Sequence, residues 1–165
     1  MVQEGACPSW GSSEGTRTAR VKRSRWSKRR RRGNRPRSHA ITSEPMAIPT
    51  TNACVAAEER LLGRPLPPRL RDRLVCENGG ELRCDGEVWQ LHPVWDPGDA
   101  RTARRSANHI ARETDAARQW RGFPENGVAI GEDGSGNRLV LLPGSDAVYR
   151  WDHETTMCDP VSPAW

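Results

Sequence analysis

Residues 128–142 read VAIGEDGSGNRLVLL and carry the clearest indication of the fold. Two apolar runs flank its glycine-rich centre, GEDGSGN, which spans residues 131–137. Short apolar runs bounded by Gly, Asp and Asn are typical of β-strands joined by a tight turn. We therefore predict an antiparallel hairpin in which glycine supplies the positive φ angles and Asp133 or Asn137 hydrogen-bonds the backbone.

Strand periodicity also marks residues 81–95, where side chains alternate between two faces. The alternation predicts one face with Trp89, Leu91 and Trp95 and an opposite face with Val88, Gln90, His92 and Val94. Asp85-Gly86 lies ahead of this strand and is typical of a hairpin turn. Residues 147–153 predict a further strand.

Helical spacing marks three other segments. A first helix starts at the capping residue Asn52 and stops at Gly63. A second begins at Pro67-Pro68, which suit a first helical turn, and ends before an Asn-Gly-Gly sequence. A third covers residues 102–120, where apolar residues recur in steps of four and three. The elements predict an α+β fold, a mostly antiparallel sheet packed with N-terminal helices and one inserted helix.

Charge divides the chain into two parts. Residues 1–45 hold 12 of the 26 basic residues and three acids, a balance of +9, whereas residues 46–165 hold 14 basic and 18 acidic residues, a balance of −4. Rich in Gly, Ser, Arg and Pro, residues 1–45 bury too little apolar surface to repay chain ordering, which predicts a disordered basic tail. Met46 opens the predicted domain, so we interpret the tail as upstream sequence attached by a misassigned start. A functional basic tail and a neutral linker are the alternatives.

The apolar segments are short. No window reaches the roughly 18 apolar residues of a membrane span, and no apolar stretch follows the basic run as a secretory signal requires. We therefore expect a cytoplasmic protein that does not bind a membrane. The five cysteines have irregular gaps and no CxxC pair, which disfavours a disulfide framework or a zinc ribbon.

Three patterns in the sequence resemble catalytic or metal-binding sites. Asp152-His153-Glu154 contains the groups of general acid and base catalysis, but on a strand both carboxylates would point away from His153. Cys76, Cys84 and His92 lack the close ligand pair of a structural zinc site. The GEDGSGN segment begins like a calcium loop, yet Gly144 stands where a bidentate Glu is needed. We therefore predict no catalytic residues, no metal and no cofactor.

A family resemblance rests on the order LLGRPLPPRLRDRL, ENGG, a strand with Trp89, VAIGEDGSGNRLVLL and VYRWDHET. Over about residues 53–158 this order resembles the SUKH superfamily, whose bacterial members are mostly immunity proteins against polymorphic or contact-delivered toxins. Fungal members regulate cell-wall synthesis through protein contacts. The resemblance implies an α+β domain that binds without turnover. It also implies structural roles for Trp89, Gly131, Gly134, Gly136, Asn137 and Trp151.

Two departures from the family pattern stand out. Leu70 occupies a position where the family commonly has an aromatic residue, a tolerable change in an apolar stripe. The family also usually ends with a helix after its last strand, and we expect the domain of residues 46–165 to lack it. Such a gap would leave one face of the core open.

The leading hypothesis is an immunity protein that neutralises a cognate protein toxin by direct binding. Its predicted partner-binding residues are Glu132, Asp133, Asp152 and Glu154, whose negative charge suits a basic toxin cleft. The alternative is a nucleic-acid-associated protein acting through the Arg-rich tail, so nucleic acid is an expected partner only if that tail is genuine. An enzyme using His153 or His92 has the weakest support.

Overall fold

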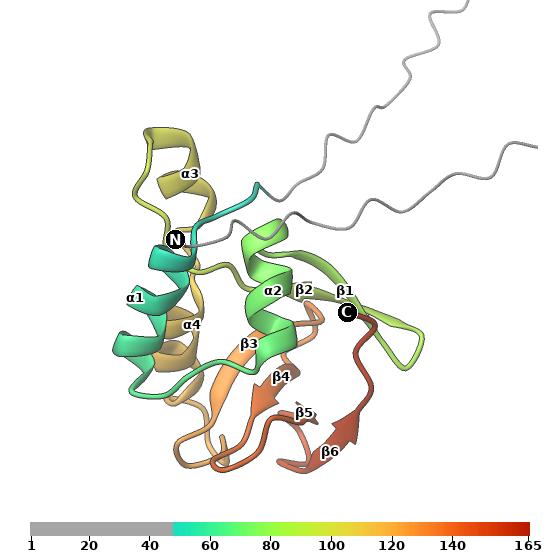
Figure 1. Ribbon diagram of the computed structural model, residues 1–165. Coiled ribbons are helices and arrows are strands. Elements are labelled where there is room, and N and C mark those ends of the chain that lie inside the picture. Colours follow the sequence, from blue (N-terminus) through green and yellow to red (C-terminus); the bar gives the residue numbers. More distant parts are fainter. Residues whose placement is uncertain (1–47) are drawn as a thin grey trace, which may run out of the picture. The chain divides into compact units, whose positions relative to one another are not determined.

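The computed structural model describes residues 48–165. The predicted disordered basic tail of residues 1–45 lies outside the described residues. In the described part, helices precede and interrupt the strands of one antiparallel sheet (Figure 1). This arrangement confirms the predicted α+β class.

The first helix, α1 (Asn52–Leu62), has one end as predicted and one that differs by a residue. Thr51, and not Asn52, is its N-cap, because Thr51 Oγ1 accepts a hydrogen bond from the Cys54 N–H at 3.2 Å. Gly63 ends the helix in the left-handed region, with a φ of 70°.

The second helix, α2 (Pro68–Cys76), follows the predicted proline pair. Pro68 stands in the first turn, where its missing N–H removes no intrahelical bond. Leu70 and Leu74 lie one turn apart and are both fully buried. The leucine at position 70 therefore fills the core without an aromatic ring.

The predicted inserted helix is two helices, α3 (Ala100–Arg105) and α4 (Ile110–Ala117). The prediction of one helix over residues 102–120 is therefore wrong. Ser106 explains the break, because its hydroxyl bonds both the Thr102 carbonyl at 2.9 Å and the Asp96 N–H at 3.0 Å. This pairing draws the chain back toward the segment before α3.

The buried side chain of Glu58 accepts a hydrogen bond from the first turn of α4. This α1 carboxylate is 1% exposed and accepts the Ala111 N–H at 2.6 Å and the Trp95 N–H at 3.2 Å. Its Oε1 also lies 2.7 Å from His109 Nδ1. A side chain about fifty residues away in sequence thus supplies an acceptor to the free N–H groups at the start of α4.

Six strands form the sheet in sequence order, and every neighbouring pair is antiparallel. They are β1 (Gly80–Cys84), β2 (Glu87–Leu91), β3 (Val128–Glu132), β4 (Arg138–Leu141), β5 (Val148–Trp151) and β6 (Cys158–Val161). Both predicted hairpins are present. In the first, Asp85 and Gly86 have φ angles of 50° and 89°, the positive values that a type I′ turn requires.

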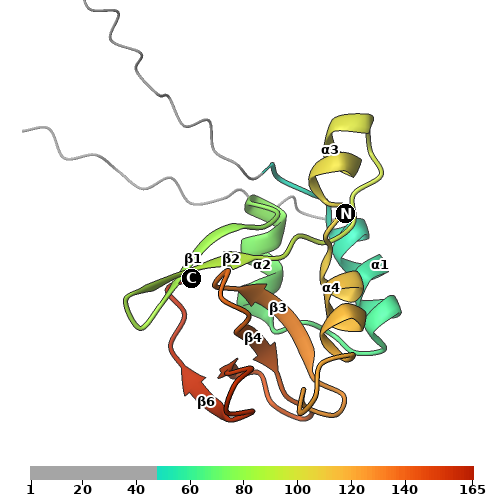
Figure 2. The same ribbon diagram turned by 180° about the vertical axis from the view of Figure 1, so that it is seen from behind.

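The sheet curls so that its two ends approach each other. After β6 the chain returns to the β1–β2 hairpin, where Pro163 forms a bridge with Cys84 and the Ala164 N–H donates to the Arg83 carbonyl at 2.8 Å. Figures 1 and 2 show this return from opposite sides. Trp165 packs against the core. The sequence did not predict β6 or this return of the chain.

Burial follows the predicted alternation only as far as the strand itself. Trp89 and Leu91 are buried, each 1% exposed, while Val88 is 45% exposed. After β2 ends at Leu91 the pattern fails, since His92 is buried and Trp95 is 39% exposed. Side-chain alternation requires extended, paired backbone, and pairing stops where β2 leaves the sheet.

Candidate functional site

The glycine-rich turn between β3 and β4 is organised by Asp133. Its Oδ1 accepts the Ser135 N–H, and its Oδ2 accepts the Ser135 hydroxyl and the Asn137 amide, each at 2.8 Å. Partial burial raises the pKa of Asp133, but these hydrogen bonds outweigh burial and hold the pKa below its ordinary value. The carboxylate is therefore charged at neutral pH and fixed in position.

A second turn follows β5, where the sequence predicted that the strand continues. Asp152 Oδ1 accepts the Thr155 N–H at 2.9 Å and the Glu154 N–H at 3.0 Å. These bonds, the one from Thr155 foremost, hold the pKa of Asp152 below its ordinary value. The prediction that residues 152–154 alternate between the faces of a strand is wrong, because Asp152 bends the chain into an Asx turn.

Asn137 and His153 join the two turns. The Asn137 side-chain oxygen accepts the His153 backbone N–H at 3.2 Å and lies 3.1 Å from His153 Nδ1. Gly136 allows this contact, since a Cβ at that position would lie 3.0 Å from His153 Nδ1 and its φ is +118°. Asp133 is thus connected through Asn137 to the turn that Asp152 holds.

Trp120 lies beside the joined turns and was not predicted as a site residue. It is 43% exposed, and its ring stands edge-on to His153 at 5.7 Å and to Trp151 at 6.3 Å between centroids. Arg138 lies over the same ring, with Cζ 5.9 Å from its centroid. Trp120 ends the amphipathic helix that the sequence predicts over residues 102–120, and an aromatic residue at that end was the available signal. The sequence does not reveal that its ring stays partly exposed.

The four predicted partner-binding residues are in three different environments. Glu132 forms an ion pair with Arg138, which neutralises its charge locally. Asp133 and Asp152 keep their charge but spend their hydrogen-bonding capacity on their own turns, and Glu154 is exposed. We call the resulting patch the two-turn surface; it consists of Trp120, Asp133, Asp152, His153 and Glu154.

The residues with implied structural roles lie at close approaches of the backbone or in the core. A Cβ at Gly131 would lie 2.9 Å from the Gln90 carbonyl oxygen, so glycine permits the close pairing of β2 with β3. Trp151 is fully buried, and its indole donates to the Gly122 carbonyl at 3.1 Å. Gly134 has a φ of +80° at the exposed tip of the turn. These positions are compatible with the roles that the resemblance implies.

The histidine of the two-turn surface does not pair with a carboxylate, whereas His109 lies against the carboxylate of Glu58. His153 Nδ1 faces an amide oxygen, and the Asp152 carboxylate is bound to backbone N–H groups. Burial lowers the pKa of His92 to about 4, so this histidine is neutral at neutral pH. Among residues 48–165, no group of three His, Cys, Asp or Glu side chains could hold a metal ion. Nor does any helix of that part have the length and apolarity to cross a membrane.

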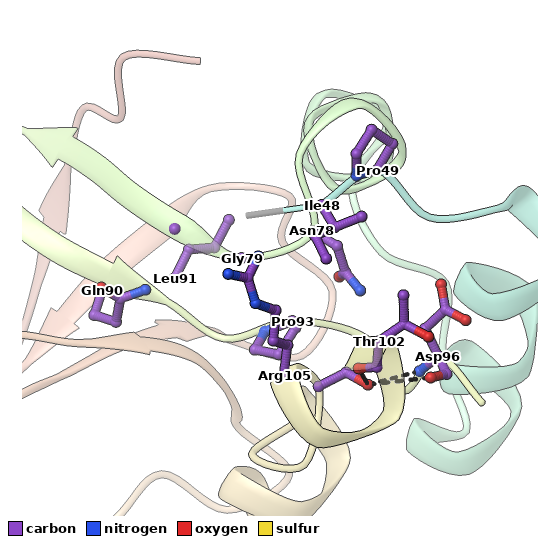
Figure 3. A pocket seen from close by; sticks show the side chains of 12 residues that line it. Ile48, Pro49, Asn78, Gly79, Gln90, Leu91, Pro93, Asp96, Thr102 and Arg105 are labelled. Atoms are coloured by element: carbon purple, nitrogen blue, oxygen red, sulfur yellow. Dashed lines mark hydrogen bonds between the residues drawn. The ribbon is translucent and has the colours of Figure 1, made fainter. Parts of the chain in front are cut away.

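A cavity of about 180 Å³ lies between the end of β2 and α3 (Figure 3). Figure 3 shows Gln90 and Leu91 at one end and Asp96 and Thr102 at the other. Its buried polar groups are satisfied within the fold: Asp96 accepts the Thr50 hydroxyl at 2.6 Å and the Gly98 N–H at 2.9 Å. The volume is below the roughly 300–1,000 Å³ of small-molecule sites, so this cavity is smaller than a typical ligand-binding pocket.

The described residues form an α+β domain whose two-turn surface exposes part of Trp120 and the side chains of Asp133 and Glu154. The model of the SMI1 / KNR4 family (SUKH-1) matches residues 49–165. The chain therefore belongs to this family, which includes toxin immunity proteins. A search of curated proteins finds no match.

Proposed function

We propose that this protein is a bacterial immunity protein that binds a cognate polymorphic or contact-delivered toxin directly, in the cytoplasm and without turnover. The family includes proteins of this kind. The observation that carries the proposal is the two-turn surface, where a partly exposed tryptophan contacts the ring of His153, the residue through which the turns of Asp133 and Asp152 are joined. Tryptophan is enriched among residues that dominate binding energy at protein interfaces.

Rigidity supports a binding role for this surface. Asp133 and Asp152 are held by hydrogen bonds from their own turns, and Asn137 ties the turns together. Side chains that are already ordered lose less conformational entropy on binding. Their fixed negative charge would speed the approach of a basic toxin surface and reject acidic competitors.

The stoichiometry of inhibition tests the proposal. Where a toxin-like reading frame lies beside the gene for this chain, its toxin domain is titrated with the full-length protein while the toxin activity is followed. A binder suppresses the activity at a molar ratio near one, whereas an enzyme acting on the toxin would suppress it at far lower amounts. Protection at clearly substoichiometric ratios, or no protection at all, contradicts the proposal.

Two substitutions test whether the two-turn surface is the interface. Trp120→Ala is expected to weaken toxin binding by at least about 2 kcal/mol, roughly thirtyfold, as for an interface hot spot. Glu154→Lys should slow association several-fold and reduce its salt dependence. Glu132 and Asp152 are unsuitable targets because the ion pair and the turn depend on them. Asp72→Lys makes the same change of charge at an exposed position of α2. This variant is the control and should bind as the parent does.

A further inference from the structure

A second cavity lies between the β1–β2 hairpin and strands β5 and β6. It measures about 240 Å³, and its lining includes Cys84, Asp85, Glu87, Trp89, Arg150 and Asp159. We call it the hairpin cavity. It shares no residue with the two-turn surface. Its volume is below the roughly 300–1,000 Å³ of metabolite sites, so we expect it to take one side chain with the main-chain group beside it and not a larger ligand.

Two of the side chains that line the hairpin cavity carry a hydrogen-bond donor that has no partner. Trp89 is 1% exposed, and its Nε1 is buried without an acceptor; the same is true of Arg150 Nε. Both groups can only donate. A buried donor without an acceptor costs about 1–3 kcal/mol, and such groups are rare in folded proteins. The lining therefore calls for an acceptor oxygen.

The charge of the lining is negative. The lining contains three carboxylates, those of Asp85, Glu87 and Asp159, and one cation, Arg150, whose Nη2 lies 3.6 Å from Asp159 Oδ2. The nearby thiol responds to this field: burial raises the pKa of Cys84 to about 11, and Asp85 and Glu87 act in the same direction. A free anion would meet the unpartnered donors but would be repelled by the carboxylates.

We propose that the hairpin cavity binds a lysine or arginine side chain of a partner protein together with a backbone carbonyl oxygen beside it. The cation pairs with Glu87 and Asp159, and the carbonyl accepts from Trp89 Nε1 and Arg150 Nε. A bare cation lacks the acceptor, and a bound water lacks the charge, whereas a basic peptide segment supplies both. The proposal goes beyond the proposed function, because it concerns different residues and any partner with such a segment.

The test uses the full-length, ¹⁵N-labelled protein and the tripeptide acetyl-Gly-Arg-Gly-amide. Titration should shift the Trp89 indole N–H resonance saturably, with a dissociation constant in the millimolar range, and should move the Arg150 Nε–H resonance with it. Glu87→Gln should weaken binding at least threefold, since Glu87 is exposed at the cavity and its loss leaves the core intact. Asp72→Asn, which removes one charge elsewhere, should leave the dissociation constant unchanged.

Matched probes separate the two requirements. Acetyl-Gly-Glu-Gly-amide keeps the carbonyls and reverses the charge, while guanidinium chloride at the same concentrations keeps the cation alone; neither should reproduce the Trp89 shift. Trp89→Phe assigns the indole resonance, and Arg150→Lys assigns the second reporter should the Phe variant not fold. A Trp89 resonance that stays still, that responds equally to either control probe, or that is as sensitive in Glu87→Gln as in the parent overturns the proposal.

Discussion

The two-turn surface and the hairpin cavity are both acidic, but their polar groups are used in opposite ways. On the two-turn surface, Asp133 and Asp152 accept hydrogen bonds from their own turns, so these carboxylates already have partners within the fold. In the hairpin cavity, Trp89 Nε1 and Arg150 Nε have no acceptor within the fold. Acidic side chains in a turn motif can therefore serve to form the turn. Buried donors without a partner are a stronger indication of a binding site.

The largest expected effect concerns His92, which is buried and interacts electrostatically with Glu132 and Arg138. Burial lowers its pKa from the ordinary 6.5 to about 4. The unfolded chain thus binds the proton more tightly, so the stability due to neutral His92 is present above pH 6.5 and is lost as pH falls toward 4. The loss should reach about 3 kcal/mol.

Urea unfolding at pH 7.5 and pH 4.5 measures this loss. In His92→Gln the part of the pH dependence between 6.5 and 4 should disappear, because the side chain no longer titrates. An unchanged slope in that variant would assign the pH dependence to other groups and contradict the role of His92.

The contact between the two turns is the next largest effect. Gly136→Ala should destabilise the domain by about 2–3 kcal/mol, because the new Cβ would crowd His153 at a φ that disfavours side chains. Gly134→Ala is a matched control: its φ is also positive, but nothing lies within 4 Å of the added Cβ, so the cost should be about 1 kcal/mol. Equal losses in thermal or urea unfolding would mean that the turns do not depend on each other.

A pair of acid substitutions tests the comparison directly. Asp133→Ala removes the acceptor of three hydrogen bonds and should cost about 1 kcal/mol, whereas Glu87→Ala at the hairpin cavity should change stability by less than about 0.5 kcal/mol. Asp133→Asn retains one acceptor oxygen and should fall between Asp133→Ala and the parent. Similar unfolding free energies for both alanine variants would remove the distinction between structural and available carboxylates.

The smallest effect is expected at Glu154. Because its side chain is exposed on the second turn, Glu154→Gln should change the free energy of unfolding by less than about 0.5 kcal/mol. Thermal unfolding of this variant beside the parent checks the expectation. A clear loss of stability would show that Glu154 also belongs to the architecture and would weaken its use as a probe of toxin binding.

Local signals allowed much of the fold to be predicted. The end of α1 at Gly63, the start of α2 at Pro68 and the Asp85-Gly86 hairpin each depend on backbone preferences of one or two residues. Such preferences act within a few residues and need no distant partner. The glycine-rich turn between β3 and β4 was predictable for the same reason, including the role of Asp133 within it.

The candidate sites were less accessible to sequence reasoning. The acids of the two-turn surface were found because they lie within the GEDGSGN and WDHET motifs, but the use of Asp152 in a turn depends on where β5 ends. Trp120 looked like the last residue of an amphipathic helix, and its exposure depends on how Arg138 and His153 surround it. The hairpin cavity combines residues from β2, β5 and β6, so no contiguous pattern announces it.

Sequence patterns were enough to predict the α+β class, the first two helices, both hairpins and the concentration of basic residues in residues 1–45. The split between α3 and α4, the return of the chain from β6 to β1, and the two donors left without acceptors became visible only in the folded chain. The two groups of features differ in the range of the interactions behind them. Turns and caps are settled by neighbours along the chain, whereas the acceptor that Glu58 offers to α4, or the one that Trp89 lacks, depends on which distant segments meet.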